Sequence, residues 1–396
     1  MTTPQPLAGV RVVEFTHMVM GPTCGMILAD MGAEVIKVEP IEGEGTRRLL
    51  GAGAGFFPMF NRNKKSIGID LKQPEGAEVA RKLATSADVV VENFKPGALT
   101  KFGLDYPGLA AGNERLIYVS CKGFLPGPYE HRTALDEVVQ MMGGLAYMTG
   151  RPGDPLRAGT SVNDIMGGMF AAIGTLGALI QRGISGKGME VQSALFENNV
   201  FLMGQHMLQY AVTGRHPKPM PARDNPWAIY DVFTVKDGEQ IFLAAVSDGQ
   251  WRTFCDVLGL QDLKDRAEYR TNNDRVKLRP QLLETLRARL ASRSAAELAE
   301  IFERAGLPFA PIRRPEDLYD DPHLQATGGL ADVVLPDGDK AGDTVKTTLF
   351  PITLAGDRLG VRLQPPRFGE HTDALMRALG YDDANIEVLK HRAVVA

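Results

Sequence analysis

Asp164 is the residue of this sequence whose surroundings best suit covalent chemistry. It stands in the segment SVNDIMGGM, ahead of the long apolar run Ile165–Ile180 and just after Ser161 and Asn163. An aspartate at the start of a helix is a favoured N-cap, because its oxygen accepts hydrogen bonds from free backbone N–H groups. The same place suits a nucleophile, because the helix dipole favours an ionised carboxylate there. Both interpretations stay open, and the local pattern alone favours the cap.

Other candidates for acid–base work are weaker. His17 follows the first predicted strand and could be a general base, but a lone histidine in a turn more often packs or donates a hydrogen bond. The same holds for His131 and His371. Asp136 and Glu137 could assist carboxylate chemistry, or simply begin the helix predicted from EVVQMMGGLAYM.

Basic and aromatic side chains gather on the loops that follow predicted strands: Arg47, Arg48, Arg62, Lys64, Lys65, Lys72, Asn93, Phe94, Lys95, Lys101 and Phe102. Any one of these cations alone is more often simply solvated. A ligand with phosphates and an adenine ring needs cations and a stacking surface. Their concentration on successive loops indicates an anion or nucleotide site. Gly21 and Pro22 suit the entry of a helix that could bind an anion, or equally a plain strand-to-helix turn.

Several common enzyme signatures are missing from the sequence. The turn THMVMGP lacks the G-x-G-x-x-G spacing of a dinucleotide site, and no G-x-x-x-x-G-K-[ST] phosphate loop occurs. Ser120 and Cys121 end a predicted strand, but without the G-x-S-x-G of an α/β-hydrolase. Cys24, Cys121 and Cys255 form neither a disulfide framework nor a metal pattern.

The elements that must position these residues alternate between strands and helices. VRVVEF, EVIKVE, SIGIDL, DVVVENF and RLIYVSCKGF are predicted strands, and GPTCGMILADMGA and PEGAEVARKLATSA are predicted helices. Continuous apolar strands linked by helices predict a doubly wound parallel sheet, with ligands beyond the strands' carboxyl ends. The run Ile165–Ile180 is predicted as a helix buried in a soluble core, since it is short for a membrane span and contains four glycines.

A composition change at 214–225 predicts a linker. After it, YDVFTVKDGEQIFLAAV predicts a hairpin turning at Lys236–Gly238, and LRPQLLETLRARLAS and SAAELAEIFERAG predict amphipathic helices. We therefore expect a large domain over 1–213, a small α+β domain over 225–320, and a return to the large domain over 335–396.

The overall charge predicts no attraction to nucleic acid or to an anionic membrane. The 396 residues carry 44 basic and 48 acidic side chains, a formal net charge of −4. Few, scattered cysteines and an N-terminus without basic and apolar blocks predict a cytoplasmic protein.

Together these segments resemble the class III CoA-transferases, the family that includes formyl-CoA transferase and the carnitine CoA-transferases. The likeness runs through PLAGVRVVEFTHMVMGP, MGAEVIKVEP, NRNKKSIGIDLKQPEG, ADVVVENFKPGAL, SVNDIMGGM, SGKGMEVQSALFEN, YDVFTVKDGE, GLPFAPI and FGEHTD. It implies a Rossmann-like large domain built from both chain ends, a small inserted domain, and two ring-like subunits interlocked as a homodimer.

The resemblance also implies the chemistry. Asp164, in a D-x-x-x-G pattern with Gly168, would be the nucleophile that forms an aspartyl anhydride and then an aspartyl-CoA thioester. Coenzyme A would be a substrate, with no tightly bound cofactor and no metal. Matching positions predict a CoA site lined by His17, Ile69, Lys72, Asn93, Phe94, Lys95 and Lys101, and place Val19 and Asp136 near the reacting groups.

Departures from the family pattern leave the acid substrates open. Val19 stands where formyl-CoA transferase has a glutamine, Pro40 stands in place of a CoA-holding arginine, and AAVSDGQW occupies the region of a glycine-rich lid. Lys122 and Arg132 suggest a second carboxylate on the substrate, although both could instead be solvated or bind CoA.

Two alternatives remain. The family also contains α-methylacyl-CoA racemases, but Leu135 takes the position of their histidine, and His131 comes too early in the motif. A catalytically silent CoA-binding protein would be expected to have lost Asp164.

Overall fold

The computed structural model describes residues 4–396. They form two compact units, one built from the chain up to Pro221 together with Pro322–Ala396, and the other from Ala222–Asp321. The sequence predicts the return to the large domain at 335, whereas the first unit resumes at Pro322. The difference arises because β10 (Leu330–Val334) pairs with β11 (Thr344–Thr348), so that both strands belong to the returning segment.

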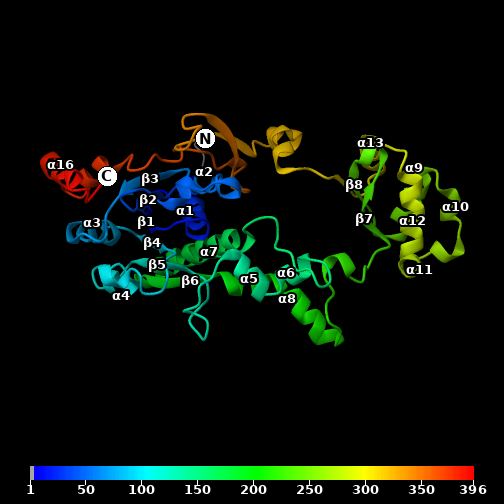
Figure 1. Cartoon of the computed structure of the whole chain (residues 1–396), viewed down its shortest axis with the longest axis horizontal. Helices are drawn as coiled ribbons and strands as arrows, with labels where there is room; N and C mark the ends of the chain where they lie inside the picture. Colours follow the sequence, from blue (N-terminus) through cyan, green and yellow to red (C-terminus); the bar gives the residue numbers. More distant parts are fainter. Residues whose placement is uncertain (1–3) are drawn as a thin grey trace. The chain divides into compact units, whose positions relative to one another are not determined.

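A six-stranded parallel sheet forms the centre of the first unit, in the order β3-β2-β1-β4-β5-β6 (Figure 1). Its strands are β1 (Arg11–Phe15), β2 (Glu34–Glu39), β3 (Lys64–Gly68), β4 (Val89–Glu92), β5 (Ile117–Lys122) and β6 (Met189–Ala194). The parallel sheet predicted from the apolar runs is confirmed. The strand β6 was not predicted, because MEVQSA is an edge strand with an interrupted apolar pattern.

The order of the strands reverses between β1 and β4. The chain moves outward from β1 through β2 to β3, then returns to β4 on the other side of β1 and continues to β5 and β6. At such a reversal the loops after the two central strands leave in opposite directions, which opens a crevice at their carboxyl ends.

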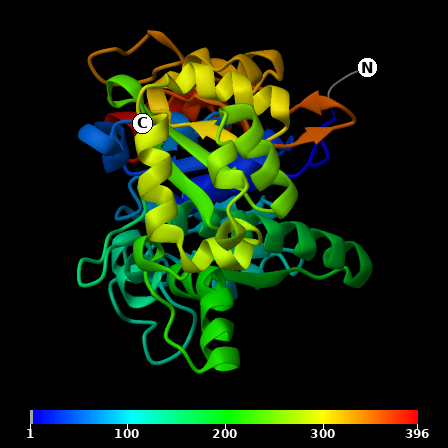
Figure 2. The same cartoon turned by 90° about the vertical axis from the view of Figure 1, so that its right-hand side faces the viewer.

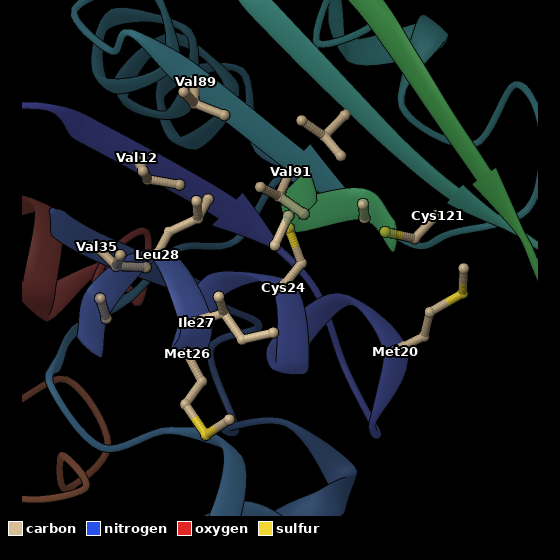
Figure 3. Packing of buried hydrophobic residues seen from close by; sticks show 14 of the residues in the cluster. Val12, Met20, Cys24, Met26, Ile27, Leu28, Val35, Val89, Val91 and Cys121 are labelled. Atoms are coloured by element: carbon tan, nitrogen blue, oxygen red, sulfur yellow. The ribbon is translucent and has the colours of Figure 1, made fainter. Parts of the chain in front are cut away.

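Helices cover both faces of this sheet. The helices of the first 221 residues are α1 (Met20–Asp30), α2 (Phe56–Phe60), α3 (Pro74–Thr85), α4 (Tyr106–Ala110), α5 (Asp136–Met142), α6 (Leu145–Thr149), α7 (Val162–Ser185) and α8 (Leu195–Thr213). The helices α1 and α7 share one apolar core with the sheet. The close view in Figure 3 shows α1 and the sheet meeting through Cys24, Ile27, Leu28, Val12, Val35, Val89 and Val91.

The returning segment completes the opposite face. It contains α14 (Pro322–Ala326), β10, β11, β12 (Thr353–Leu354), β13 (Asp357–Arg358), α15 (Thr372–Ala378) and α16 (Asp383–His391). The helices α15 and α16 bury Met376 and Ile386 against residues of α3 and β3. Val395 forms a β-bridge with Ile69, and the Gly68 and Asp70 N–H groups donate to the carbonyls of Ala396 and Val394.

The long helix α7 is not wholly buried, which corrects the sequence-based prediction. Ala171, Thr175 and Ala178 pack inward, but Ile180 and Ile184 are 71% and 78% exposed. Among residues 4–396, α7 is the helix long and apolar enough to cross a membrane, and 39% of its most apolar window is buried. One partly buried helix of this kind is weak evidence for a membrane span, because core helices share its composition.

The helix predicted from EVVQMMGGLAYM is divided into α5 and α6 at Gly143 and Gly144. Gly144 has φ of +89°, a left-handed conformation that glycine adopts without strain. A Cβ on Gly143 would lie 2.3 Å from Oδ1 of Asn199, so α5 and α8 can approach closely only at a glycine.

The second unit has its own sheet and core. Its strands are β7 (Ile229–Thr234), β8 (Gln240–Ala245) and β9 (Phe309–Pro311), and its helices are α9 (Asp248–Leu258), α10 (Gln261–Lys264), α11 (Asn272–Lys277), α12 (Arg279–Leu290) and α13 (Ala295–Ala305). The antiparallel pair β7–β8 turns through Lys236–Gly238, as the sequence predicts. Helices, yellow to yellow-green in Figure 2, pack on this sheet through Phe254, Leu286 and Phe302.

Short 3-10 helices complete the described chain at Gly45–Arg48, Gly51–Gly53, Thr100–Phe102, Met220–Ala222, Lys236–Gly238, Ala267–Tyr269 and Pro315–Asp320.

Candidate active site

A cavity of about 590 Å³ opens in the first unit at the carboxyl ends of β1, β2 and β4. Its size is that of a cofactor or small-ligand pocket, and it lies where the strand order reverses. The floor is apolar, with Phe15, Val38, Ile69 and Leu99 among the lining side chains. This combination suits an elongated ligand with apolar parts.

The cavity brings together most of the residues predicted to bind CoA. His17, Ile69, Lys72, Phe94 and Lys101 line it. Ile69 is buried, whereas Lys72 and Lys101 are exposed and can meet charged groups at the rim. Asn93 and Lys95 lie on the same loop but do not line the cavity.

Asn93 instead holds the backbone of His17. The His17 N–H donates to Oδ1 of Asn93 over 2.9 Å, and Nδ2 of Asn93 donates to the His17 carbonyl over 2.8 Å. This amide clamp joins the loop after β1 to the loop after β4. Gly21 lies against the clamp, since a Cβ there would come within 2.6 Å of Thr16 and 3.1 Å of Asn93.

Two further contacts fix the loop that carries His17. The Met18 N–H donates to Oγ1 of Thr46 over 3.0 Å, and Nζ of Lys37 donates to the Thr16 carbonyl over 2.9 Å. Met18 has φ of +62°, an unusual conformation for a residue with a side chain. The loop is therefore held in one conformation by contacts on both sides.

The imidazole of His17 lies beside Phe94, with 5.3 Å between ring centroids. Burial, and next the positive charge of Lys37, lower the pKa of His17 below its ordinary value. The imidazole of His17 is thus mainly neutral at neutral pH, so that one ring nitrogen can donate a hydrogen bond and the other can accept one.

Beneath the cavity lies a buried network of charged side chains. Lys37 contacts Glu44 at 2.9 Å, while Arg47 contacts Glu39 at 2.7 Å. Lys64 contacts Glu14 at 2.7 Å, and burial lowers the pKa of Lys64 to about 8. Sequence reasoning missed this network, although a lysine inside the buried strand EVIKVE is a signal for a paired internal charge.

Asp164 is the third residue of α7, and the N-cap position belongs to Ser161. The capping interpretation of Asp164 is therefore wrong. Burial, and next the negative charge of Asp136, raise the pKa of Asp164 from 3.8 to about 7, against the opposing charge of Arg157. A substantial share of this carboxyl is ionised, and so nucleophilic, at neutral pH.

Asp136 caps the helix that carries Asp164. One oxygen, Oδ1, accepts the N–H groups of Asn163 at 2.8 Å and of Asp164 at 3.2 Å. The other accepts from Nε2 of Gln140 and lies 3.8 Å from Arg157. Asp136 is buried, so this contact anchors the first turn of α7 and also occupies N–H groups that could otherwise bind an anion.

Close packing joins the Asp164 helix to the cavity loop. A Cβ on Gly168 would lie 2.5 Å from both the Met20 carbonyl and Cβ of Thr23, so α1 and α7 touch at this glycine. Gly168 is four residues after Asp164 on the same face of α7, and Met20 follows the His17 loop by three residues. The first turn of α1 therefore lies against the second turn of α7, about one turn after Asp164.

The start of α1 offers backbone donors at this junction. Its N-cap, Val19, makes no side-chain capping contact. Within residues 4–396, no hydrogen-bond acceptor takes the N–H of Met20 or Gly21. Free first-turn N–H groups can stabilise negative charge.

These features can be compared with known proteins. The family model "CoA-transferase family III" matches residues 7–372. This chain belongs to that family. A succinate–glutarate CoA-transferase of Agrobacterium fabrum is 34% identical over 387 residues, which cover 94% of this chain and 96% of that protein.

Two other class III relatives agree with this assignment. A formyl-CoA:oxalate CoA-transferase of Rhodopseudomonas palustris is 32% identical over 411 residues, covering 96% of this chain and 95% of that one. The crystal structure of a CAIB/BAIF family protein from Brucella suis is 34% identical, with a TM-score of 0.86, covering 95% of this chain and 100% of that one. As a class III CoA-transferase, the chain is an enzyme that moves CoA between an acyl-CoA and a carboxylate.

The departures from the family pattern have defined places in this CoA-transferase. Val19 is buried at the N-cap of α1, and Pro40 lines the cavity. The lid region AAVSDGQW forms the end of β8 and the start of α9, where Ser247 caps the helix and Asp248 contacts Arg275 at 2.6 Å.

The two cations considered for a second substrate carboxylate already have partners. Lys122 contacts Glu92 at 2.5 Å and donates to the Phe94 carbonyl over 2.8 Å. Arg132 is exposed and lies over the ring of Tyr129, 4.1 Å from its centroid. These contacts favour structural roles for both side chains.

Proposed function

We propose that this enzyme transfers CoA from an acyl-CoA donor to a small dicarboxylic acid, with Asp164 as the covalent nucleophile. One observation carries the proposal. Asp164, whose pKa is raised to about 7, lies on α7, and α7 packs against α1, which begins directly after the cavity-lining loop of His17. The cavity has the size and the apolar floor that a pantetheine arm and an adenine need. Lys72 and Lys101 at its rim suit the CoA phosphates.

The mechanism needs no proton transfer at the nucleophile. The ionised Asp164 carboxylate attacks the thioester carbonyl, and the collapse of the adduct expels CoA thiolate and leaves a mixed anhydride. The thiolate attacks the aspartyl carbonyl, releases the first acid and forms an aspartyl-CoA thioester. The acceptor carboxylate then displaces CoA thiolate to give a second anhydride, whose acceptor carbonyl the thiolate attacks, restoring Asp164.

Competing nucleophiles are poorly placed for such chemistry. Burial raises the pKa of Cys24 to about 12 and that of Cys121 well above its usual value, so neither is a thiolate at neutral pH. Racemase chemistry needs a histidine near the reacting carbon. His131 is exposed and contacts Glu130 at 3.0 Å, and Leu135 supplies no acid or base.

The preference for a dicarboxylate rests on relatives rather than on an assigned subsite. The Agrobacterium fabrum protein carries the name of a succinate–glutarate CoA-transferase. We therefore propose succinyl-CoA as donor and glutarate as acceptor for the first assays.

The direct test mixes the enzyme with a panel of acyl-CoAs, adds hydroxylamine, and measures the mass of the intact protein and of its peptides. A hydroxamate on Asp164 that forms with succinyl-CoA is the expected result. Failure of every donor to label Asp164, together with exchange of the α-hydrogen of a 2-methylacyl-CoA, would place the enzyme with the racemases.

We further propose the interlocked homodimer that the family resemblance implies, in which the exposed side of α7 and α8 meets a second copy of this chain. Ile180 and Ile184 on α7, and Phe201, Leu208 and Val212 on α8, are each more than half exposed. The end of α8 extends away from the rest of the first unit in both views (Figures 1 and 2). Apolar surface of this extent favours burial in a partner.

Sedimentation velocity tests the dimer. A mass near twice 43.0 kDa is expected, and Ile184→Glu is expected to lower the share of dimer recovered after unfolding and refolding. A monomeric wild-type enzyme contradicts the proposal.

We also propose a cytoplasmic location, which suits the free thiols of Cys24, Cys121 and Cys255.

A further inference from the structure

Asn198, in the first turn of α8, has a buried amide without a hydrogen-bond partner. Its side chain belongs to a residue only 6% exposed, and among residues 4–396 no acceptor takes its Nδ2 hydrogens. A buried amide left unpaired destabilises the folded state. Such a cost is usually tolerated where the group has a partner during function.

The amide lies beside the face of α7 that carries Asp164. Its Nδ2 is 2.8 Å from the place that a Cβ on Gly167 would occupy, and Cε of Met20 is 2.5 Å from the same place. Gly167 follows Asp164 by three residues, so the two share a face about one helical turn, or roughly 5 Å, apart. The absence of a side chain at Gly167 lets the amide approach this face.

The first-turn backbone of α7 supplies no free N–H group to a developing negative charge near Asp164. The N–H groups of Asn163 and Asp164 are both taken by Asp136. Further donors must therefore come from side chains or from neighbouring elements. The free N–H groups of Met20 and Gly21 lie in the first turn of α1, which packs on α7 at Gly168, and the amide of Asn198 lies beside Gly167.

We propose that Asn198 is a catalytic residue whose Nδ2 donates a hydrogen bond to the oxyanion formed during acyl transfer to Asp164. The inference rests on the proposed nucleophilic role of Asp164 and adds a residue to that site. The partner of the amide is then the carbonyl oxygen of the reacting acyl group.

The step balances without a proton. An Asp164 oxygen forms a bond to the thioester carbon, and the carbonyl π electron pair moves to the carbonyl oxygen, which becomes the oxyanion. When this pair returns, the carbon–sulfur bond breaks and its electrons leave with CoA thiolate. The hydrogen bond from Asn198 strengthens as the oxygen becomes charged and weakens as the anhydride forms, so it lowers the barrier more than it strengthens binding.

Asn199 provides a matched control next to Asn198. It is 0% exposed, and both its Nδ2 and its Oδ1 lack partners among the described residues. Its Oδ1, however, lies 2.3 Å from the Cβ position of Gly143, just after α5, and not beside Gly167. Asn199→Ala therefore removes an equally buried amide from the same turn without removing the proposed donor.

The experiment measures single-turnover release of CoA thiolate from succinyl-CoA, CoA affinity by calorimetry, and thermal stability. These are compared for wild type, Asn198→Ala, Asn198→Asp and Asn199→Ala. For Asn198→Ala we expect release to slow by about 100-fold or more, the range for loss of one oxyanion donor. CoA affinity is expected to stay within about twofold, and Asn199→Ala to keep the wild-type rate even if its melting temperature falls.

Asn198→Asp keeps the shape of the side chain but replaces the donor with a negative charge, and it is expected to be at least as slow as Asn198→Ala. If Asn198→Ala does not fold, the rate of Asn198→Asp alone tests whether Asn198 is the donor. A wild-type rate in either variant overturns the inference, and so does an equal loss in Asn199→Ala. A wild-type enzyme that forms no hydroxamate on Asp164 instead rejects the underlying function.

Discussion

The cavity and the Asp164 region treat their buried polar groups in opposite ways. Under the cavity, charged side chains meet opposite charges, as Lys37 meets Glu44 and Arg47 meets Glu39. Around Asp164, a carboxyl faces a second carboxylate, and the amides of Asn163 and Asn198 lack partners. The first arrangement holds a binding surface in place before the ligand arrives. The second leaves polar groups unsatisfied, which is the arrangement expected if the proposed reaction supplies their partners.

Replacing Asp164 with alanine should have the largest effect, and it should lower turnover without changing CoA affinity. Turnover is expected to fall by about 10⁴-fold or more, because the covalent route is lost. CoA affinity, measured by calorimetry, is expected to stay within about twofold. Asp382→Ala, which removes the N-cap of α16, is a control for loss of an aspartate from a helix start. CoA transfer by the Asp164→Ala variant at the wild-type rate would contradict the proposed covalent mechanism.

The charge of Asp136 should be separable from its capping contact. Activity of the wild type is expected to rise with pH through about 7, as Asp164 loses its proton. In Asp136→Asn the remaining oxygen can still accept both N–H groups, but the negative charge is gone, so the midpoint should move to lower pH. At pH 6 the ionised share of Asp164 could then rise by up to about tenfold. An unchanged midpoint in the rate profile contradicts this account.

On the cavity side, Asn93→Ala removes the amide clamp on His17. Two hydrogen bonds are lost, and CoA affinity is expected to fall by about tenfold, equivalent to about 1.4 kcal/mol. Asn113→Ala is the matched control, since Nδ2 of Asn113 also bridges two loops, through the carbonyls of Thr85 and Ala87. An equal loss of CoA affinity in both variants would mean that the clamp acts only on global stability.

The smallest effect concerns stability. Because folding raises the pKa of Asp164, the folded state binds this proton more tightly than the unfolded chain, and stability falls as pH rises from about 4 to 7. Asp164→Asn removes that loss. Its melting temperature should exceed that of the wild type by a few degrees at pH 8, and the gain should shrink at pH 5. A variant less stable than wild type at pH 8 argues against strain at the nucleophile.

The sheet and its ligand edge could be predicted because their signals are local. Apolar runs such as VRVVEF and DVVVENF predict buried parallel strands, and the residues after them line the cavity. The break between α5 and α6 at Gly143 was not predicted from the sequence, because the close approach of Asn199 from α8 is a contact between distant residues. The exposed side of α7 was hidden too, because its sequence is apolar all round.

The residues around Asp164 were only partly predictable. The motif resemblance placed Asp136 near Asp164, but the hydrogen bonds that cap α7 join residues 27 and 28 positions apart, and no local pattern encodes them. Asn198 was not identified, since an asparagine at a helix start ordinarily satisfies its own backbone. Its unpaired amide becomes visible only when Gly167 is placed beside it.

The bridge between Ile69 and Val395 has a consequence for how the protein is made. Ile69 lines the cavity, and its neighbours Gly68 and Asp70 take their backbone partners from Ala396 and Val394. A ribosome adds about 5–20 residues per second, so the segment that pairs with the end of β3, at Val394 to Ala396, is synthesised about 16 seconds or more after β3 itself. The nascent chain thus cannot complete the wall of the cavity at Ile69 until synthesis has passed Val395.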